Sequence, residues 1–194
     1  MKQLLLLILF ISTFSFGQEV LIYGRQIDFP CVDSVLHVRN SESIPRNLND
    51  YDLLMIFSTA NSRLKEGEEV AIQHYLEQGG RLYLGADNWP LVEECNQLMN
   101  RFYRQECYGN FDEDKLEEQV LTENSLKRLD SRTTVSFPMH QDLRVEAWSN
   151  DNPMVLSGKI GQGKIVLDGG YSRFYDACDN KEVLLDIINL LLSE

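Results

Sequence analysis

The sequence predicts an α/β protein: a three-layer sandwich around a mainly parallel, flavodoxin-like sheet, with an antiparallel hairpin at one edge. Two observations predict this fold class. Residues 51–90 read in order as a buried strand, an amphipathic helix, a glycine stop, a second buried strand and a turn into another helix. Residues 153–170 then read as two strands joined by a glycine-rich turn, and an apolar helix follows them.

Three strands are predicted in the first part of the chain. Residues 19–24 form a short apolar run closed by a glycine, which suits a buried parallel strand. Residues 35–38 alternate in polarity, as a half-exposed strand does. Residues 53–57 are all apolar and too few for a helix, so we expect a strand that is covered on both faces.

The next helix is predicted over residues 65–78, because one face at helical spacing carries Val70, Ala71, Tyr75 and Leu76. Two glycines, at positions 79 and 80, end it where a glycine stop is expected.

A strand over residues 82–84 leads into a second helix. Pro90 suits the first turn of that helix, because proline lacks the amide hydrogen that a first turn does not use. Cys95 lies on its apolar stripe, so we expect this cysteine to be buried.

The periodic signal fades between residues 105 and 136, where the charged segment 113–129 predicts one or two short surface helices. Alternation returns at residues 143–148, a predicted strand, and residues 181–192 predict a nearly apolar helix.

Residues 1–17 have the layout of a secretory signal peptide, with one cation at Lys2, an apolar run and a small-residue exit near Gly17. The apolar run is shorter than the ~20 residues that a membrane-spanning helix needs. We therefore expect cleavage near Gly17, a periplasmic or secreted protein, and a single domain over residues 18–194 that is not membrane-embedded.

The charge balance narrows the possible partners. Thirty acidic residues against 18 basic ones give a net charge of −12. Nucleic-acid binding needs a basic stripe along the phosphates, so we expect no nucleic-acid partner. The same balance disfavours an anionic membrane surface, and a solubilising acidic coat explains it.

Four cysteines allow two disulfides in an oxidising compartment, with three possible connectivities. Cys31 and Cys178 fall in loops at the carboxyl ends of predicted strands, and Cys107 comes shortly after the helix that carries Cys95. We therefore expect the pairs Cys31–Cys178 and Cys95–Cys107. No CxxC motif occurs, which disfavours a thioredoxin-type redox site and a zinc knuckle.

The segments YDLLMIFSTANS, EGEEVAIQHYLEQGG and RLYLGADNWP resemble the core of the class I glutamine amidotransferase-like superfamily. The later run GKIGQGKIVLDGGYSRFYDACDNKEVLLDIINLL looks like the closing segment of non-catalytic, exported bacterial members. In the working enzymes a cysteine nucleophile sits on a turn after the second strand, the nucleophile elbow, where this chain has Asp87. A carboxylate cannot form the thioester that glutamine hydrolysis uses. His140 also lacks the glutamate partner that is usual in the family.

Ligands of open parallel sheets bind outside the carboxyl ends of the strands. The residues expected there could hold a small polar ligand, with an aromatic plane for stacking and a guanidinium for an anion. The alternative is that these strand tips are polar only because loops are solvated. The candidate ligand-binding residues are Arg25, Ser58, Thr59, Asp87, Asn88, Trp89 and Arg173.

Asp87 with His140 or Asp168 is the catalytic alternative, a hydrolase acting on a small polar, glycan or peptide substrate. Asp87 and Asp168 could also share a divalent cation, but no third ligand follows at motif spacing, so neither a metal nor another cofactor is expected. The sequence favours an exported, catalytically silent domain that serves as a binding or interaction module in the cell envelope. Its expected partner is a small polar ligand or an envelope protein.

Overall fold

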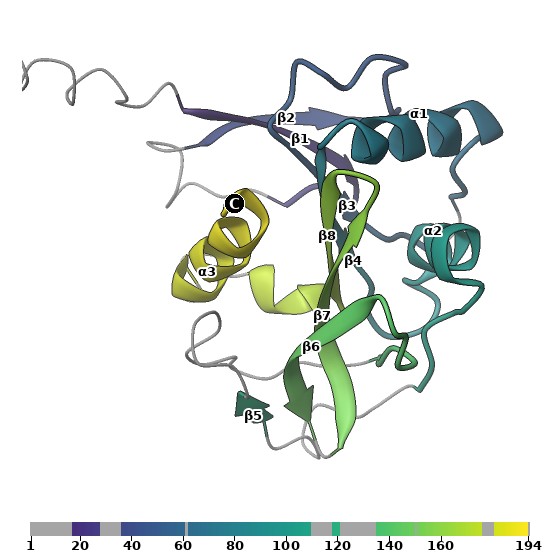
Figure 1. Cartoon of the computed structure of the whole chain (residues 1–194), viewed down its shortest axis with the longest axis vertical. Coiled ribbons are helices and arrows are strands. Elements are labelled where there is room, and N and C mark those ends of the chain that lie inside the picture. Colours follow the sequence, from purple (N-terminus) through teal and green to yellow (C-terminus); the bar gives the residue numbers. More distant parts are fainter. Residues whose placement is uncertain are drawn as a thin grey trace, which may run out of the picture.

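The computed structural model describes residues 17–27, 36–60, 62–109, 118–120, 135–149, 151–175 and 181–193. These residues form the α/β fold that the sequence predicts (Figure 1). Within them, eight strands make one sheet in the order β2-β1-β3-β4-β8-β7-β6-β5.

The first five strands in this order are parallel, as the buried apolar runs predict. They are β2 (Leu36–Ser41), β1 (Gln18–Gly24), β3 (Leu53–Phe57), β4 (Arg81–Gly85) and β8 (Gly163–Asp168). The sheet then continues as an antiparallel meander through β7 (Asn152–Ile160), β6 (Leu143–Ser149) and β5 (Glu118–Val120). The predicted antiparallel edge is therefore confirmed, and a short further strand extends it.

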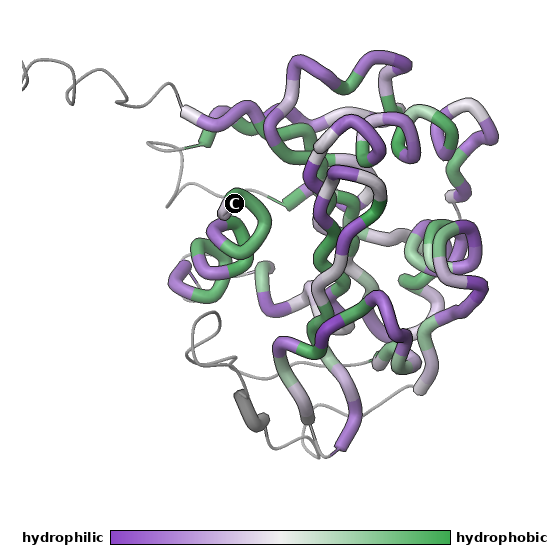
Figure 2. Tube along the Cα trace, viewed as in Figure 1, coloured by the Kyte–Doolittle hydropathy of each residue, from purple (hydrophilic) through white to green (hydrophobic). Residues whose placement is uncertain are grey.

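Helices cover both faces of the sheet. In Figure 1, α1 (Glu66–Glu77) and α2 (Glu93–Tyr103) lie on one side of the sheet and α3 (Lys181–Leu192) lies on the other. A single turn of 3-10 helix, η2 (Tyr171–Phe174), shares the side of α3. Figure 2 shows that hydrophobic residues concentrate in the central strands and on the helix faces that meet them.

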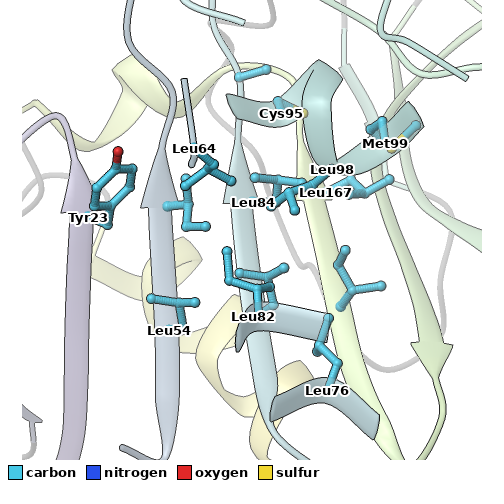
Figure 3. Packing of buried hydrophobic residues seen from close by; sticks show 14 of the residues in the cluster. Tyr23, Leu54, Leu64, Leu76, Leu82, Leu84, Cys95, Leu98, Met99 and Leu167 are labelled. Carbon is cyan, nitrogen blue, oxygen red and sulfur yellow. The ribbon is translucent and has the colours of Figure 1, made fainter. Parts of the chain in front are cut away.

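Strand alternation divides the core into two layers. Leu54, Leu84 and Leu167 belong to the layer covered by α1 and α2, and Cys95 and Leu98 of α2 lie near Leu84 and Leu167 (Figure 3). The intervening strand residues point toward α3 and η2. Because β3 and β4 are covered on both faces, they carry no exposed apolar side chain.

The buried face of α1 differs from the predicted one. Val70 is 50% exposed, and Ile72 is buried in its place beside Tyr75 and Leu76. The helix rotates this way because the Glu68 carboxylate is drawn inward. It accepts hydrogen bonds from the backbone nitrogens of Ile44 (3.1 Å) and Lys65 (2.8 Å).

Two further expectations are corrected. Pro90 precedes the helix instead of opening it: α2 begins at Glu93, after a turn that contains the cis Trp89–Pro90 bond. Part of the segment expected to form surface helices is a strand, because residues 118–120 pair with β6. The rest of that segment, and residues 1–16 of the expected signal peptide, lie outside the described residues.

In the described part of the chain, every helix is too short or too polar to cross a membrane.

Two glycines give a matched test of this packing. Gly24 has a φ of +88°, and a Cβ there would lie 2.1 Å from the Phe57 carbonyl oxygen, which accepts the Arg25 amide. We expect Gly24→Ala to lower the free energy of unfolding by about 2–4 kcal/mol. Gly67 in α1 has open space around it, so Gly67→Ala should raise that free energy by up to about 1 kcal/mol. Urea unfolding of both variants measures this, and a neutral Gly24→Ala would contradict the close approach of β1 to β3.

Candidate functional site

The turn that the resemblance predicts to be a nucleophile elbow lies directly after β4, where backbone hydrogen bonds join it to β8 and η2. The Ala86 amide donates to the Asp168 carbonyl (2.8 Å), and the Ala86 carbonyl accepts from the Tyr171 amide (3.2 Å). Ala86 itself is fully buried. The turn that would present a nucleophile is therefore held on two sides by backbone hydrogen bonds.

Asp87, which the resemblance places at the nucleophile position, is turned inward. Its side chain is 1% exposed. Oδ1 accepts the backbone N–H of Asn88 (2.7 Å), and Oδ2 accepts that of Ser172 (2.9 Å). Hydrogen bonds from backbone amides to a carboxylate are charge-assisted, so they stabilise its buried charge. Asp87 thus ties the elbow to η2.

A second buried carboxylate, Asp168, sits at the end of β8. Oδ2 accepts the Tyr83 hydroxyl (2.8 Å), while Oδ1 accepts the Gly170 amide (3.1 Å) and pairs with Arg173 Nη1 (3.0 Å). The Asp168 side chain is 0% exposed and that of Arg173 is 1% exposed. Burial, reinforced by the Asp168 charge, raises the pKa of Tyr83 well above its usual range, so the phenol remains a proton donor.

The tip of β3 is occupied by contacts to α2. Ser58 Oγ accepts the Cys95 amide (3.0 Å), which satisfies one of the free N–H groups of the first helical turn. The Thr59 amide and hydroxyl both donate to the Glu94 carboxylate (2.8 Å each), and the Ser62 hydroxyl joins them (2.7 Å). Sequence reasoning missed Glu94. Its place in the first turn of α2, together with the hydroxyls of Thr59 and Ser62 in the loop after β3, was the available signal.

Arg25 is the candidate cation that remains exposed. Its guanidinium lies 4.7 Å from the centroid of the Tyr175 ring, and Tyr175 is itself 41% exposed. Below them, the Tyr171 hydroxyl donates to the Ser58 carbonyl (2.6 Å). Burial, together with nearby Tyr175 and Asp87, raises the pKa of Tyr171. This stack links the tips of β1 and β3 to η2.

His140 lies at the other end of α2. Its ring is 5.1 Å from that of Tyr103, the last residue of the helix, and its Nδ1 is 3.5 Å from Asp142 Oδ2. The elbow precedes the start of α2, and 11 helical residues span about 16 Å. Asp87 hydrogen-bonds to Ser172 before the start of α2. His140 instead contacts Tyr103 and Asp142 near the end of the helix.

The structure divides the predicted ligand-binding residues into two groups. Ser58, Asp87 and Arg173 are buried, and their polar atoms hold the strand tips together. Arg25, Asn88 and Trp89 are exposed, and Thr59 is half-buried. Trp89 is 63% exposed, the most exposed large hydrophobic side chain among the described residues.

The expected Cys95–Cys107 disulfide is not formed, because both residues are free thiols. The Cys95 side chain is fully buried on the face of α2 that packs on the sheet. Cys107 Sγ donates instead to Asn96 Oδ1 (3.0 Å). Burial raises the pKa of both thiols, that of Cys107 to about 12, so both are protonated at neutral pH. Cys31 and Cys178 lie outside the described residues, and their pairing stays a prediction.

No group of three or more metal-ligating side chains occurs in the part of the chain that the structure describes. The two larger of the described cavities lie outside the cluster of buried polar groups around Asp87 and Asp168. One, of about 650 Å³, runs between β6, β7, β8 and the end of α3. Its charged groups are largely engaged, because Arg144 pairs with Glu146 and Lys164 with Ser193. The other, of about 610 Å³, lies between α1 and α2 and reaches Trp89.

Comparison with solved structures reveals the same fold in proteins of low sequence identity. A cytoplasmic protein from Salmonella typhimurium matches with a TM-score of 0.61 and 12% identity, over 90% of this chain and 98% of its own. The N-terminal domain of mmIFT52 matches with a TM-score of 0.64 and 12% identity, over 90% and 98%. A ThuA-like protein from Bacteroides uniformis matches with a TM-score of 0.56 and 12% identity, over 95% and 96%. No family model and no curated protein sequence matches the chain.

The buried pair at the end of β8 yields a stability prediction. Arg173→Met removes the cation and leaves the Asp168 carboxylate in a site that excludes water, so we expect a loss of about 3–5 kcal/mol in the free energy of unfolding. Arg25→Met is the matched control, because an exposed cation–π contact contributes only about 0.5–1 kcal/mol. Chemical denaturation measures both losses. Equal losses in the two variants would show that the pair is not the buried contact described above.

Proposed function

We propose that this chain is an exported, catalytically silent domain of the class I glutamine amidotransferase-like type, and that it serves as a binding module in the cell envelope. The observation that carries the proposal is the state of Asp87. Its carboxylate stands at the nucleophile position, yet it is buried and accepts a backbone amide at each oxygen. A nucleophile or general base must reach its substrate, so this carboxylate is placed to stabilise the fold.

The other groups of a catalytic centre are engaged in the same way. The Asp168 carboxylate bonds to Tyr83, Gly170 and Arg173, and its side chain is fully buried from solvent. His140 contacts Tyr103 and Asp142 near the far end of α2. General acid–base catalysis requires partners within about 2.6–3.2 Å of each other or of the substrate. The hydrolase alternative would need these groups to leave their present partners.

Two further observations support the family and the compartment. The ThuA-like neighbour covers almost the whole chain and belongs to the same fold type as the amidotransferase-like domains. The N-terminal sequence has the layout of a signal peptide, and Gly17, the expected exit, directly precedes β1. Cleavage there would leave the first strand of the sheet intact.

Turnover assays test catalytic silence. We expect no ammonia release from glutamine and no hydrolysis of chromogenic ester and glycoside substrates above the rate of the buffer. The reason is that no free carboxylate, imidazole or thiolate is presented by the elbow. Asp87→Asn is the matched variant, since it keeps the size of the side chain and removes its charge. Turnover that the native protein shows and folded Asp87→Asn lacks would overturn the proposal and favour the hydrolase.

A further inference from the structure

We propose that the groove between α1 and α2 is a binding site for neutral oligosaccharides, with Trp89 as its stacking platform. This inference rests on the proposed function, because it gives the binding module a site and a ligand class. The groove has a volume of about 610 Å³, within the ~300–1,000 Å³ range of small-molecule sites. It lies between the two helices and includes Trp89 from the loop after β4, but none of the buried residues around Asp87 and Asp168.

The floor of the groove is already ordered. Arg101, from α2, donates to the Glu69 carboxylate (3.1 Å) and to the side-chain oxygen of Gln73 (2.7 Å), both on α1. Gln97 Nε2 donates to the Leu64 carbonyl (2.7 Å), while its Oε1 accepts the Leu64 amide (2.9 Å). These bonds fix the two helices relative to each other, so a ligand would meet a preorganised surface and lose little affinity to reordering.

The rim offers groups that the fold itself does not use. In the described part of the chain, the side chains of Asn100 and Arg104 form no hydrogen bond or ion pair, although both line the groove. Trp89 lines it too, with 63% of its surface exposed. Exposing the apolar surface of an indole to water is unfavourable in free energy. Stacking against an apolar face of a ligand removes part of that surface from water.

The charge of the groove identifies the ligand class. Its lining contains three arginines and three glutamates, so it is neutral within a chain that carries a net charge of −12. An ionic ligand would meet as much repulsion as attraction there. A sugar ring presents hydroxyls that both donate and accept, and an apolar face of C–H groups. Amides, carboxylates and guanidiniums bind such hydroxyls, and indole covers the apolar face. The charged lining residues are Arg63, Arg101, Arg104, Glu69, Glu93 and Glu106.

Arg104 gives an independent indication. It ends α2 in the left-handed conformation, with a φ of 59°, a position where glycine is the favoured residue. The chain therefore has an arginine, with its long cationic side chain, at a position whose backbone conformation favours glycine. Non-glycine residues in this conformation are found at functional sites more often than elsewhere. A binding role for the exposed guanidinium explains why arginine stands there.

Binding is measured with a fixed set of probes: maltohexaose, cellohexaose, xylohexaose, mannohexaose and chitohexaose. The chain has two tryptophans, so Trp148→Phe leaves Trp89 as the sole indole reporter. We expect at least one hexasaccharide to change its fluorescence in a saturable way. By calorimetry, Trp89→Ala should weaken the affinity for that sugar by about tenfold or more, as the loss of an aromatic anchor does. Tyr175→Ala removes another exposed aromatic, at the strand tips, and should leave the affinity unchanged.

Arg104→Gly separates binding from stability. It should raise the melting temperature by about 2–4 °C, because it relieves the left-handed backbone, and weaken sugar binding severalfold. Asp151→Gly is the matched control: Asp151 has a φ of 64° and lies outside the groove. It should give a similar rise in melting temperature with unchanged affinity.

Three outcomes would overturn the proposal. The first is that none of the five hexasaccharides binds, and the second is that binding survives Trp89→Ala. The third is that only the anionic hexagalacturonate binds, which would contradict the argument from neutral charge. Binding lost in Tyr175→Ala and kept in Trp89→Ala would move the site to the strand tips and leave the binding-module function standing. The function itself fails only in the turnover assay.

Discussion

Two buried carboxylates at the carboxyl ends of β4 and β8 are the constraint on which the rest of this structure depends. Asp168 holds Tyr83, Gly170 and Arg173 together, and Asp87 accepts the amide of Ser172. Both anchor η2 over the centre of the sheet, where Tyr171 and Phe174 pack against Phe57 and Tyr83. A buried charge costs several kcal/mol unless it is paired, so the strand tips are stable only in this closed arrangement.

That arrangement has a functional consequence. In an open parallel sheet the strand tips are the usual ligand site, but here polar groups at the tips of β3, β4 and β8 are engaged in structural contacts. The accessible candidate side chains lie beside these contacts. Among them, Trp89 follows the turn after β4 and lines the groove between α1 and α2. The proposed binding groove therefore lies beside these structural contacts and uses other side chains.

The sequence predicted the fold well and the site only in part, for physical reasons. Buried strands such as residues 53–57 and helices with an apolar stripe are local patterns, so their existence follows from composition and period. The phase of α1 did not follow, because the burial of Glu68 depends on a backbone amide 24 residues away. The same limit applied to Asp87 and Arg173. Their residue types suggested a ligand site, while their partners, Ser172 and Asp168, follow from the folding of η2 back onto the tips of β4 and β8, which a single sequence does not display.

The closed state of Asp87 is tested most directly by amide hydrogen exchange at Ser172, followed by NMR. If Asp87 Oδ2 holds this amide inside the fold, Ser172 should exchange as slowly as the amides of the central strands. In folded Asp87→Ala its exchange should become fast, while amides of β3 and β4 keep their protection. Rapid exchange of Ser172 in the native protein would contradict the account, because Asp87 would then be free of η2 and open to chemistry.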